Sequence, residues 1–294
     1  MQSEPSIGVT GSTGAIGGRV AQQLAEAGVP QRLIVRDLAR APTIEGAEVA
    51  IAEYADGESM RRALDGVQTL FLVSGAEHVD RLEQHKTAID AAVDAGVERI
   101  VYTSYLTAAP DSTFTLARQH WHTEEHMRAL PLRTTFLRNG MYLDGTMDYL
   151  ASSGVIKGPA GEGKVAPVPR DDLGSVAGTV LLEGSVHDGA AYRLTGPVAH
   201  SLTEWMAIVS DVCGATIRFE DETIESAWEW RRDLAEDWVV EAWISSYLAI
   251  ATGELDVVSD DVEVVTGTPA TGVREYLEGH PDLVDQLRSA RSRS

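Results

Sequence analysis

Residues 9–20, VTGSTGAIGGRV, join an apolar run to an amphipathic stretch through a turn that is rich in glycine. The pattern predicts a short buried strand at Ile7–Thr10 and a helix at Gly17–Glu26. A glycine-rich turn between a strand and a helix is typical of a loop whose backbone approaches the phosphates of a dinucleotide. The stretch therefore decides the fold class, and it raises the question of which dinucleotide is bound.

Three glycines of this turn have distinct expected roles. Gly11 permits the tight turn out of the strand, Gly14 lets the backbone approach a pyrophosphate, and Gly17 lets the helix pack closely on the strand. The free N–H groups and the dipole at the start of the helix then hold the phosphates. A nucleoside triphosphate loop is a poor alternative, because the Gly-Lys-Ser/Thr ending that it requires is absent.

The rest of the first half alternates apolar runs with amphipathic stretches, which predicts a parallel sheet covered by helices on both faces. We expect a Rossmann-type, doubly wound α/β fold with a dinucleotide-binding domain at 1–150 and a smaller, mostly helical substrate region at 151–294. Some strands of the second region are expected to return to the first sheet. Further strands are expected at 32–36, 48–54, 69–75, 99–104 and 133–140, with helices at 59–64, 78–95 and 116–130.

The second half contains clearer signals for helix ends than for strands. Ser201 is a plausible N-cap and Gly214 a plausible C-terminal stop for the helix between them. Residues 223–252 are expected to be mostly helical. A strand near 165–170, a helix near 171–183 and a strand near 190–196 are expected to form one more unit beside the sheet.

The end of the second predicted strand, LIVRD, bears on cofactor choice. An acidic residue there would bind the adenosine ribose, whereas an arginine accommodates a 2′-phosphate. Arg36 occupies the position, with Arg40 as a helper, and guanidinium groups pair well with phosphate. We therefore expect NADP(H) to be preferred, while the neighbouring Asp37 leaves NAD(H) open.

The composition limits the partners. The formal net charge of −21 argues against nucleic acid and against an anionic membrane surface, both of which need Lys/Arg-rich surfaces. The single cysteine excludes an intrachain disulfide and fits a reducing cytoplasm. No secretory signal and no apolar run of membrane-spanning length are found. We expect a cytoplasmic protein, and its fold is compatible with a homodimer.

The acid–base pair of short-chain dehydrogenases, Tyr-x-x-x-Lys, is absent from the chain. The helix that would hold it reads LARQHWHTEEHM, residues 116–127, and offers His120 instead. His120 and Glu124, like His122 and His126, are four residues apart, as metal ligands on a helix would be. We interpret them as one polar helix face and expect no metal.

At this point the sequence resembles a known family, the NmrA-like atypical short-chain dehydrogenases. Within it, the similarity is to the NAD(P)H:quinone oxidoreductase type 2 and triphenylmethane reductase branch. The Tyr/Lys pair is missing in that family too. The resemblance covers the first 200 residues well and the remainder weakly. The matching stretches are VTGSTGAIGG, LIVRD, AEYAD (52–56), LFLVSG, QHKTAIDAAVDAGVERIVYTSY (84–105), LARQHWHTEE and TTFLRNGMY (134–142).

The resemblance implies a role for each matching site residue. The turn would hold the pyrophosphate and Arg36 the 2′-phosphate, while His120, Tyr105 and Tyr142 are the candidates for a hydrogen-bond donor to the substrate. Glu53, where the family mostly has aspartate, and Asp37, where it often has asparagine, depart from the pattern. The implied cofactor-binding residues are Thr10, Gly11, Ser12, Thr13, Gly14, Ala15, Ile16, Arg36, Ser74, Gly75, Thr103, Ser104, Asn139, Gly140 and Met141.

The function that this resemblance implies is direct hydride transfer from NAD(P)H to a quinone or a similar conjugated aromatic acceptor. Such acceptors delocalise the developing charge, so positioning supplies most of the rate. Two alternatives stay open. One is a ketoreductase or monooxygenase-like enzyme that tailors an aromatic natural product, and the other is a non-enzymatic sensor of the dinucleotide.

Overall fold

The computed structural model describes residues 6–290, and a seven-stranded sheet is its central element. The strands are ordered β3-β2-β1-β4-β5-β6-β9, and the pairs β3–β2, β2–β1, β1–β4 and β4–β5 are parallel. The predicted Rossmann-type fold is thereby confirmed. The strands are β1 (Ile7–Thr10), β2 (Gln31–Val35), β3 (Ala47–Ile51), β4 (Thr69–Leu72), β5 (Arg99–Tyr105), β6 (Arg133–Asn139) and β9 (Ala191–Leu194).

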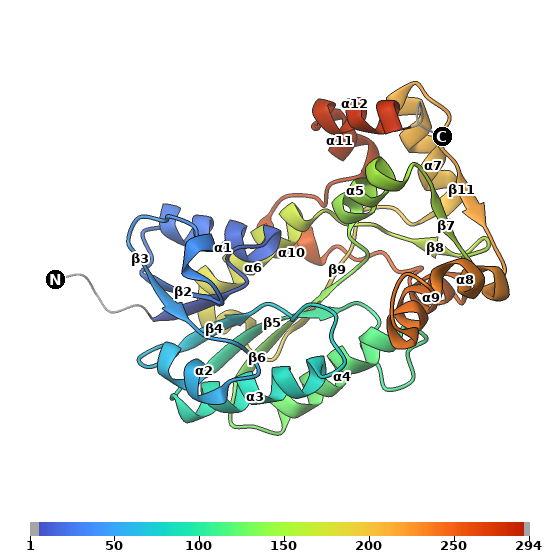
Figure 1. The fold of residues 1–294 in the computed structure, drawn as a ribbon. Helices are drawn as coiled ribbons and strands as arrows, with labels where there is room; N and C mark the ends of the chain where they lie inside the picture. The colour runs from blue at the N-terminus through green and yellow to red at the C-terminus, as the bar shows by residue number, and fades with distance from the viewer. Residues whose placement is uncertain (1–5, 291–294) are drawn as a thin grey trace. The chain divides into compact units, whose positions relative to one another are not determined.

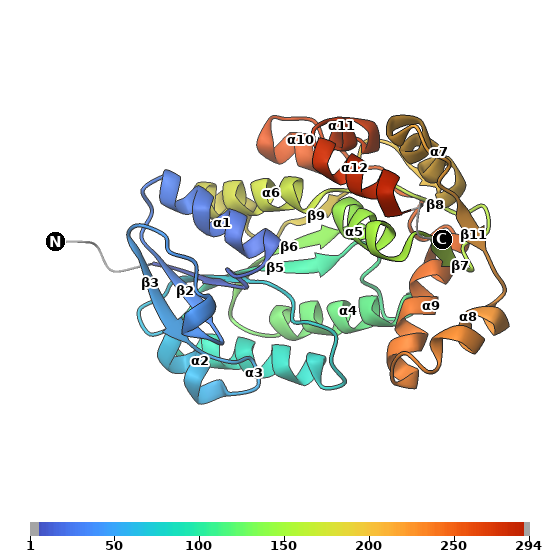
Figure 2. The same cartoon turned by 45° about the horizontal axis from the view of Figure 1, so that its top comes forward.

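Helices cover both faces of this sheet. In Figures 1 and 2, α1 and α6 lie on one face and α2, α3 and α4 on the other. The side chains between the sheet and α2–α4 form a buried apolar cluster that includes Leu70, Ile89 and Met127. Two glycines of α6 let it approach α1, because a Cβ at Gly178 would lie 2.0 Å from the Gln23 side chain. The helices are α1 (Ala15–Glu26), α2 (Gly57–Ala63), α3 (Arg81–Asp94), α4 (Thr115–Arg128) and α6 (Arg170–Glu183).

The chain divides into two compact units, and each draws on three separate segments. Unit 1 comprises residues 1–105, 119–138 and 173–192, and unit 2 comprises 106–118, 139–172 and 193–294. None of the helices among residues 6–290 is long and apolar enough to cross a membrane.

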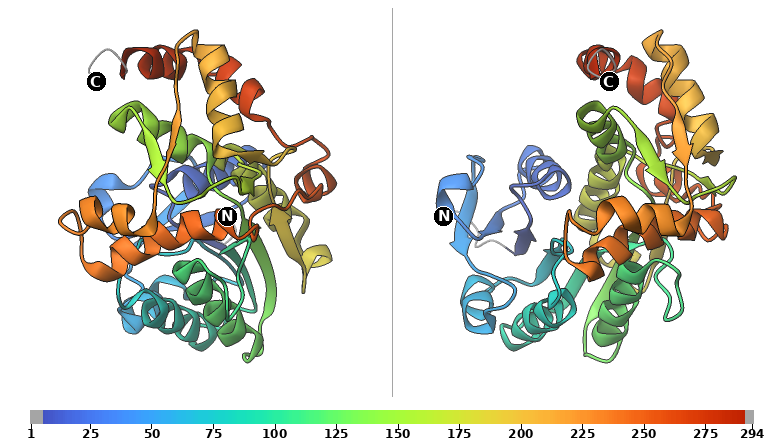
Figure 3. Two further views of the ribbon diagram at one scale, coloured as in Figure 1. Left: turned by 90° about the vertical axis from the view of Figure 1, so that its right-hand side faces the viewer. Right: turned by 45° about the vertical axis from the view of Figure 1, so that its right-hand side comes forward.

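Unit 2 is mostly helical and has two small two-stranded pairings, β10–β8 and β11–β7. As the sequence predicts, Ser201 is the N-cap of α7 and Gly214 its C-terminal stop. Ser201 also forms a capping box with Glu204, and Gly214 has a φ of 62°. In Figure 3, α8 and α9 lie side by side, and Ala227 and Ile244 are buried between them. The elements are α5 (Leu143–Ser153), β7 (Ile156–Gly158), β8 (Lys164–Val165), β10 (His200–Ser201), α7 (Leu202–Cys213), β11 (Phe219–Asp221), α8 (Ile224–Arg231), α9 (Asp237–Ala251), α10 (Asp261–Thr266), α11 (Val273–Glu278) and α12 (Pro281–Ala290).

Several predicted element ends are wrong by two or three residues. Helix α1 begins at Ala15, two residues earlier than predicted, because Gly14 already serves as its N-cap. Strands β3 and β4 end at Ile51 and Leu72, three residues earlier than predicted. After β4, the backbone groups of Val73 and Ser74 form hydrogen bonds with side chains and not with the backbone of a neighbouring strand.

A buried carboxylate ties α4 to the sheet in unit 1. The side chain of Glu124 is fully buried, and Arg138 donates to both of its oxygens, at 2.9 and 2.6 Å. Arg128 donates to Oε2 at 2.8 Å and the Ser104 hydroxyl to Oε1 at 2.6 Å. This carboxylate is therefore fully engaged within the protein and is not a free metal ligand.

Replacing this carboxylate tests its structural role. We expect Glu124→Ala to lower the free energy of unfolding by about 2–4 kcal/mol, because the arginine at the sheet loses its buried partner. Urea denaturation measures the change, with the exposed Glu125→Ala as the matched variant on the same helix. If Glu124→Ala lowers the free energy of unfolding no more than Glu125→Ala does, the Arg138 guanidinium does not need this carboxylate as its partner.

Candidate functional site

A cavity of about 330 Å³ in unit 1 lies at the carboxyl ends of β1, β2 and β4. The strand order reverses direction between β1 and β4, and such a switch point is where doubly wound sheets bind ligands. Six residues that the sequence assigns to cofactor binding line this cavity: Thr10, Gly11, Thr13, Arg36, Ser74 and Gly75. The cavity is also lined by Tyr54, His78 and Gln84, for which no local sequence pattern indicates a role.

Two glycines of the turn are required by the packing of the protein itself. A Cβ at Gly17 would lie 2.3 Å from the carbonyl oxygen of Gly11, far inside van der Waals contact. Gly11 has a φ of 64°, and its Cβ would lie 2.9 Å from Val73. Gly14 differs from both, because its φ is −104° and the nearest atom to a Cβ there is 3.4 Å away. The folded chain alone therefore does not exclude a side chain at position 14.

The start of α1 has the properties of an anion site. Gly14 provides no side-chain cap, and the first turn of the helix has no acidic residue. The hydroxyl of Ser12 is buried and makes no hydrogen bond among the described residues. An unsatisfied buried hydroxyl costs free energy that a ligand oxygen recovers, and helix N–H groups bind phosphate. The residues present therefore fit a pyrophosphate.

The contrast between two glycines gives a test. We expect Gly14→Ala to weaken dinucleotide binding at least about tenfold, because the methyl group occupies the phosphate approach, while stability changes by less than about 1 kcal/mol. Gly17→Ala is expected to destabilise the fold by about 3 kcal/mol through overpacking. Calorimetric titration and urea denaturation measure the two effects. Wild-type dinucleotide affinity in Gly14→Ala would contradict a pyrophosphate that approaches the backbone at Gly14.

Arg36 directly follows β2, and its exposed side chain lines the cavity. The carboxylate of Asp37 points elsewhere, because it accepts a hydrogen bond of 2.9 Å from the backbone N–H of Ala39 and caps the short turn Leu38–Arg40. Glu53, which follows β3, lines the same cavity. Of the two charged residues that directly follow β2, Arg36 lines the cavity and Asp37 does not.

This arrangement predicts selectivity between cofactors. Arg36→Ala should weaken NADPH binding by about 10–100-fold and NADH binding by less than about twofold, because only NADPH carries the 2′-phosphate. Fluorescence titration with each cofactor measures the ratio, and Arg62→Ala, at an exposed arginine of α2 outside the cavity lining, is the comparison variant. Equal losses for both cofactors would contradict a 2′-phosphate site at Arg36.

Side chains from three parts of unit 1 hold the cavity wall that follows β4. The backbone N–H of Val73 donates to Thr10 Oγ1 at 2.9 Å, and the Tyr54 hydroxyl donates to the Val73 carbonyl at 2.6 Å. The N–H of Ser74 donates to Thr103 Oγ1 at 2.7 Å. Burial raises the pKa of Tyr54, so its phenol remains a neutral donor.

Both polar backbone groups of Gly75 are bound by side chains of α3. Its N–H donates to His85 Nε2 at 2.8 Å, and its carbonyl accepts from Arg81 Nε at 2.8 Å. Arg81 Nη2 in turn lies 2.9 Å from His120 Nε2, and His120 Nδ1 lies 2.9 Å from the Tyr102 hydroxyl. The cavity wall therefore rests on a buried polar network.

The partners fix the protonation of both histidines. An arginine can only donate, so His120 Nε2 is the acceptor, and the Nδ1–H donates to Tyr102. His85 accepts at Nε2, and its Nδ1–H faces Thr123 Oγ1 at 3.1 Å. Burial and the charge of Arg81 lower the pKa of His85 to about 3 and that of His120 well below its usual value. Both rings are neutral.

The remaining predicted residues of unit 1 lie close to this network or to the turn. Ser104 is buried and directs its hydroxyl to Glu124. The ring of Tyr105, at the end of β5, is centred 6.2 Å from that of His120. Ala15 is the exposed first residue of α1, and Ile16 is buried beneath it. Within residues 6–290, no three potential metal ligands converge.

The other predicted residues belong to unit 2. Asn139 is buried and donates from Nδ2 to the Tyr142 hydroxyl at 3.3 Å, while its Oδ1 has no partner among the described residues. Gly140 passes so close to β9 that a Cβ would lie 3.2 Å from the Leu194 carbonyl. Met141 and Tyr142 follow, and Tyr142 immediately precedes α5.

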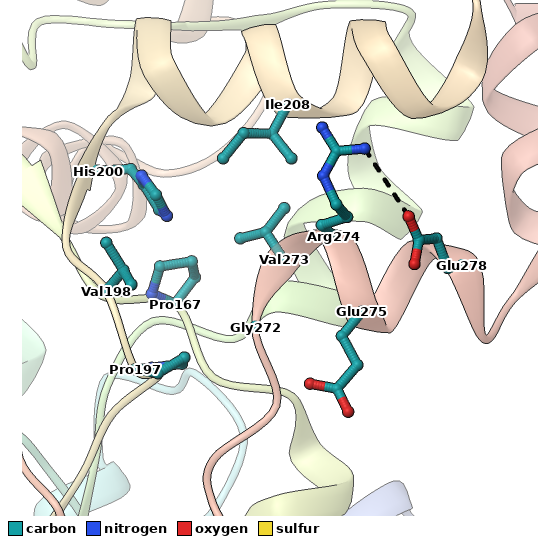
Figure 4. Close-up of a pocket in the computed structure, with 10 residues that line it drawn as sticks. All are labelled: Pro167, Pro197, Val198, His200, Ile208, Gly272, Val273, Arg274, Glu275 and Glu278. Atoms are coloured by element: carbon teal, nitrogen blue, oxygen red, sulfur yellow. Dashed lines mark ion pairs between the residues drawn. The ribbon is translucent and has the colours of Figure 1, made fainter.

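A second cavity, of about 370 Å³, lies within unit 2 (Figure 4). Proline and aliphatic side chains, among them Pro167 and Val273, form its walls. The charged side chain of Arg274 at its rim is paired with Glu278 at 3.8 Å and with Asp211 at 2.6 Å. None of the residues that the sequence assigns to catalysis or cofactor binding lines this cavity.

Comparison with known proteins identifies the family of this chain. Residues 3–230 match the model of the NmrA-like family. The chain belongs to the NmrA-like family. A structure of the NADPH-dependent quinone oxidoreductase QOR2 from Escherichia coli, complexed with NADPH, is similar with a TM-score of 0.84 and 31% identity, covering 93% of this chain and 99% of that one.

Two further similar proteins are named as reductases of other compounds. The triphenylmethane reductase of Citrobacter sp., complexed with NADP(H), has a TM-score of 0.81 and 32% identity over 93% of this chain and 99% of that one. A Streptomyces griseus protein, (4-alkanoyl-5-oxo-2,5-dihydrofuran-3-yl)methyl phosphate reductase, is 32% identical over 93% of this chain and 97% of its own.

Proposed function

We propose that this protein is an NADPH-dependent reductase that transfers hydride directly to a quinone or a similar conjugated acceptor. The observation that carries the proposal is the cavity at the switch point of the sheet, which residues of the glycine turn and Arg36 line together. Gly14 adds support, because the packing of the protein alone does not require glycine there, whereas a pyrophosphate at the start of α1 would require the close backbone approach that glycine permits. The cofactors named for the E. coli and Citrobacter relatives agree with this assignment.

Each part of the proposed cofactor has residues suited to it. The start of α1 would hold the pyrophosphate, Arg36 would pair with the 2′-phosphate, and Ser74 and Gly75 would line the opposite wall. When bound, the reduced nicotinamide supplies the hydride. The chain itself orients the cofactor and excludes water, which is how positioning contributes to the rate.

The acceptor class follows from what the three relatives' names have in common. Hydride addition to a quinone or to a conjugated 5-oxo-2,5-dihydrofuran gives a delocalised anion, and hydride addition to a cationic triphenylmethane dye neutralises a delocalised cation. A strong acid–base pair is therefore unnecessary, and the chain has no Tyr-x-x-x-Lys. The ring nitrogens of His120 are both engaged within unit 1. Tyr105 and Tyr142 are the other predicted candidates for a donor to the developing phenolate.

A second candidate function is the reduction of a small biosynthetic intermediate. The Streptomyces griseus relative supports it, because the similarity extends over 97% of that protein and its name specifies one such compound. The residues of the cavity in unit 1 serve both candidates equally well, since both use the same cofactor. The acceptor must therefore be decided by assay.

The experiment follows the loss of NADPH absorbance with a panel of simple benzoquinones and naphthoquinones, in air and then without oxygen. We expect quinone-dependent oxidation that persists without oxygen, and we expect Gly14→Ala to abolish it at low NADPH. Activity that needs oxygen would favour an oxidative tailoring enzyme. NADPH binding without turnover on any quinone would favour the second candidate or a sensor, and absence of NADPH binding would overturn the proposal.

A further inference from the structure

We propose that Arg81 and His85, which we call the Gly75 clamp, are positioning residues that set the cofactor-facing wall of the cavity. The proposal rests on the proposed function, because it treats this wall as the surface against which the dinucleotide binds. It also gives His120 a role through Arg81, as a support of the clamp.

The wall needs such a clamp because it lies beyond the sheet. Strand β4 ends at Leu72, so the next three residues gain no ladder hydrogen bonds from β1 or β5. Val73 and Ser74 are tied by side chains of the neighbouring strands and of the loop after β3. Gly75 is tied by α3 alone among the described contacts, through two residues that are four positions apart.

The geometry at Gly75 fixes the orientation of the wall. His85 accepts from the N–H of this residue and Arg81 donates to its carbonyl, so the peptide groups on both sides of the residue are held. A Cβ at position 75 would lie 3.3 Å from His85 Nε2, which is tighter than an ordinary contact. Glycine therefore permits the close approach of the imidazole. The residues on either side, Ser74 and Ala76, both line the cavity.

Arg81 is itself held in one position. Its side chain is buried and donates to three different acceptors: the Gly75 carbonyl, Gln119 Oε1 at 3.2 Å and His120 Nε2 at 2.9 Å. A planar guanidinium with fixed donors can satisfy these three together, whereas an ammonium group cannot reproduce the fork. Tyr102 holds the other side of the His120 ring. His120 thus limits where Arg81 can place the carbonyl of Gly75.

The clamp works only with neutral imidazoles, because both histidines accept a hydrogen bond at Nε2. The groups that face them include the Arg81 guanidinium, the hydroxyls of Tyr102 and Thr123, and each other. No carboxylate is among their described hydrogen-bond partners, so nothing in contact with them favours protonation. Burial and the charge of Arg81 lower the pKa of both rings, which favours the neutral form that this geometry requires.

The test is a split between cofactor affinity and turnover. We expect His85→Leu to raise the Kd for NADPH about tenfold, roughly the equivalent of one lost hydrogen bond. Turnover with benzoquinone at saturating NADPH should stay within about twofold of the wild type. His85→Gln, whose amide oxygen can accept from Gly75, should restore affinity to within about threefold. His120→Leu should also raise the Kd, because Arg81 loses one of its three acceptors.

The control is His122→Leu, which removes an exposed histidine from the same helix as His120 and should change neither quantity. Thermal unfolding identifies variants that do not fold. If His85→Leu does not fold, Arg81→Lys, which keeps the charge, is measured in its place, and we expect the same rise in its Kd for NADPH. Wild-type affinity in folded His85→Leu, or in folded Arg81→Lys, would overturn the clamp. Reduced turnover with unchanged Kd in His120→Leu would instead make His120 a catalytic donor. Failure of the wild type to bind NADPH would reject the proposed function itself.

Discussion

The contact on which the site depends is the approach of α1 to the end of β1, where Gly17 faces the Gly11 carbonyl without a side chain between them. Any larger residue at position 17 would push the helix away from the strand. With glycine there, the first N–H groups of α1 reach the edge of the sheet at the point where strand order reverses. This local closeness places the start of α1 beside the cavity, which Gly11 and Thr13 of the turn line together with Arg36 at the end of β2.

The opposite wall is built on a different principle. Backbone groups in a strand are held by the ladder, which is insensitive to side-chain identity. Beyond Leu72 the ladder stops, and the wall depends on the hydroxyls of Thr10, Tyr54 and Thr103 and on two side chains of α3. The phosphate end of the cavity is therefore set by glycines and the far wall by polar side chains, so different substitutions should affect each.

This difference explains what could be predicted from the sequence. The turn at Gly11–Gly17 and Arg36 have local signatures, since their roles follow from the residues immediately around them. The end of β4 could not be located, because the apolar run continues through Val73 after the ladder has stopped. The polar ties of the wall join residues far apart in the chain, such as Tyr54 and Thr10, and no periodicity indicates them. In the sequence, nothing distinguishes His85 from other polar residues of a helix. Only the folded structure shows that its Nε2 accepts a hydrogen bond from the N–H of Gly75.

The same buried network bears on why the chain has no Tyr-x-x-x-Lys. In that pair a cation lowers the pKa of a tyrosine that faces the substrate. Here a tyrosine, Tyr102, and a cation, Arg81, also lie in one network, but both are buried and His120 stands between them. Burial outweighs the charge and raises the pKa of Tyr102. A phenol in that setting accepts a hydrogen bond and holds a ring in place, but it does not give up its proton. The network therefore contains a tyrosine, a histidine and a cation, which are residue types that acid–base catalysis uses, but their burial gives them a structural role. Such a network suits an acceptor whose reduction depends on positioning more than on proton transfer.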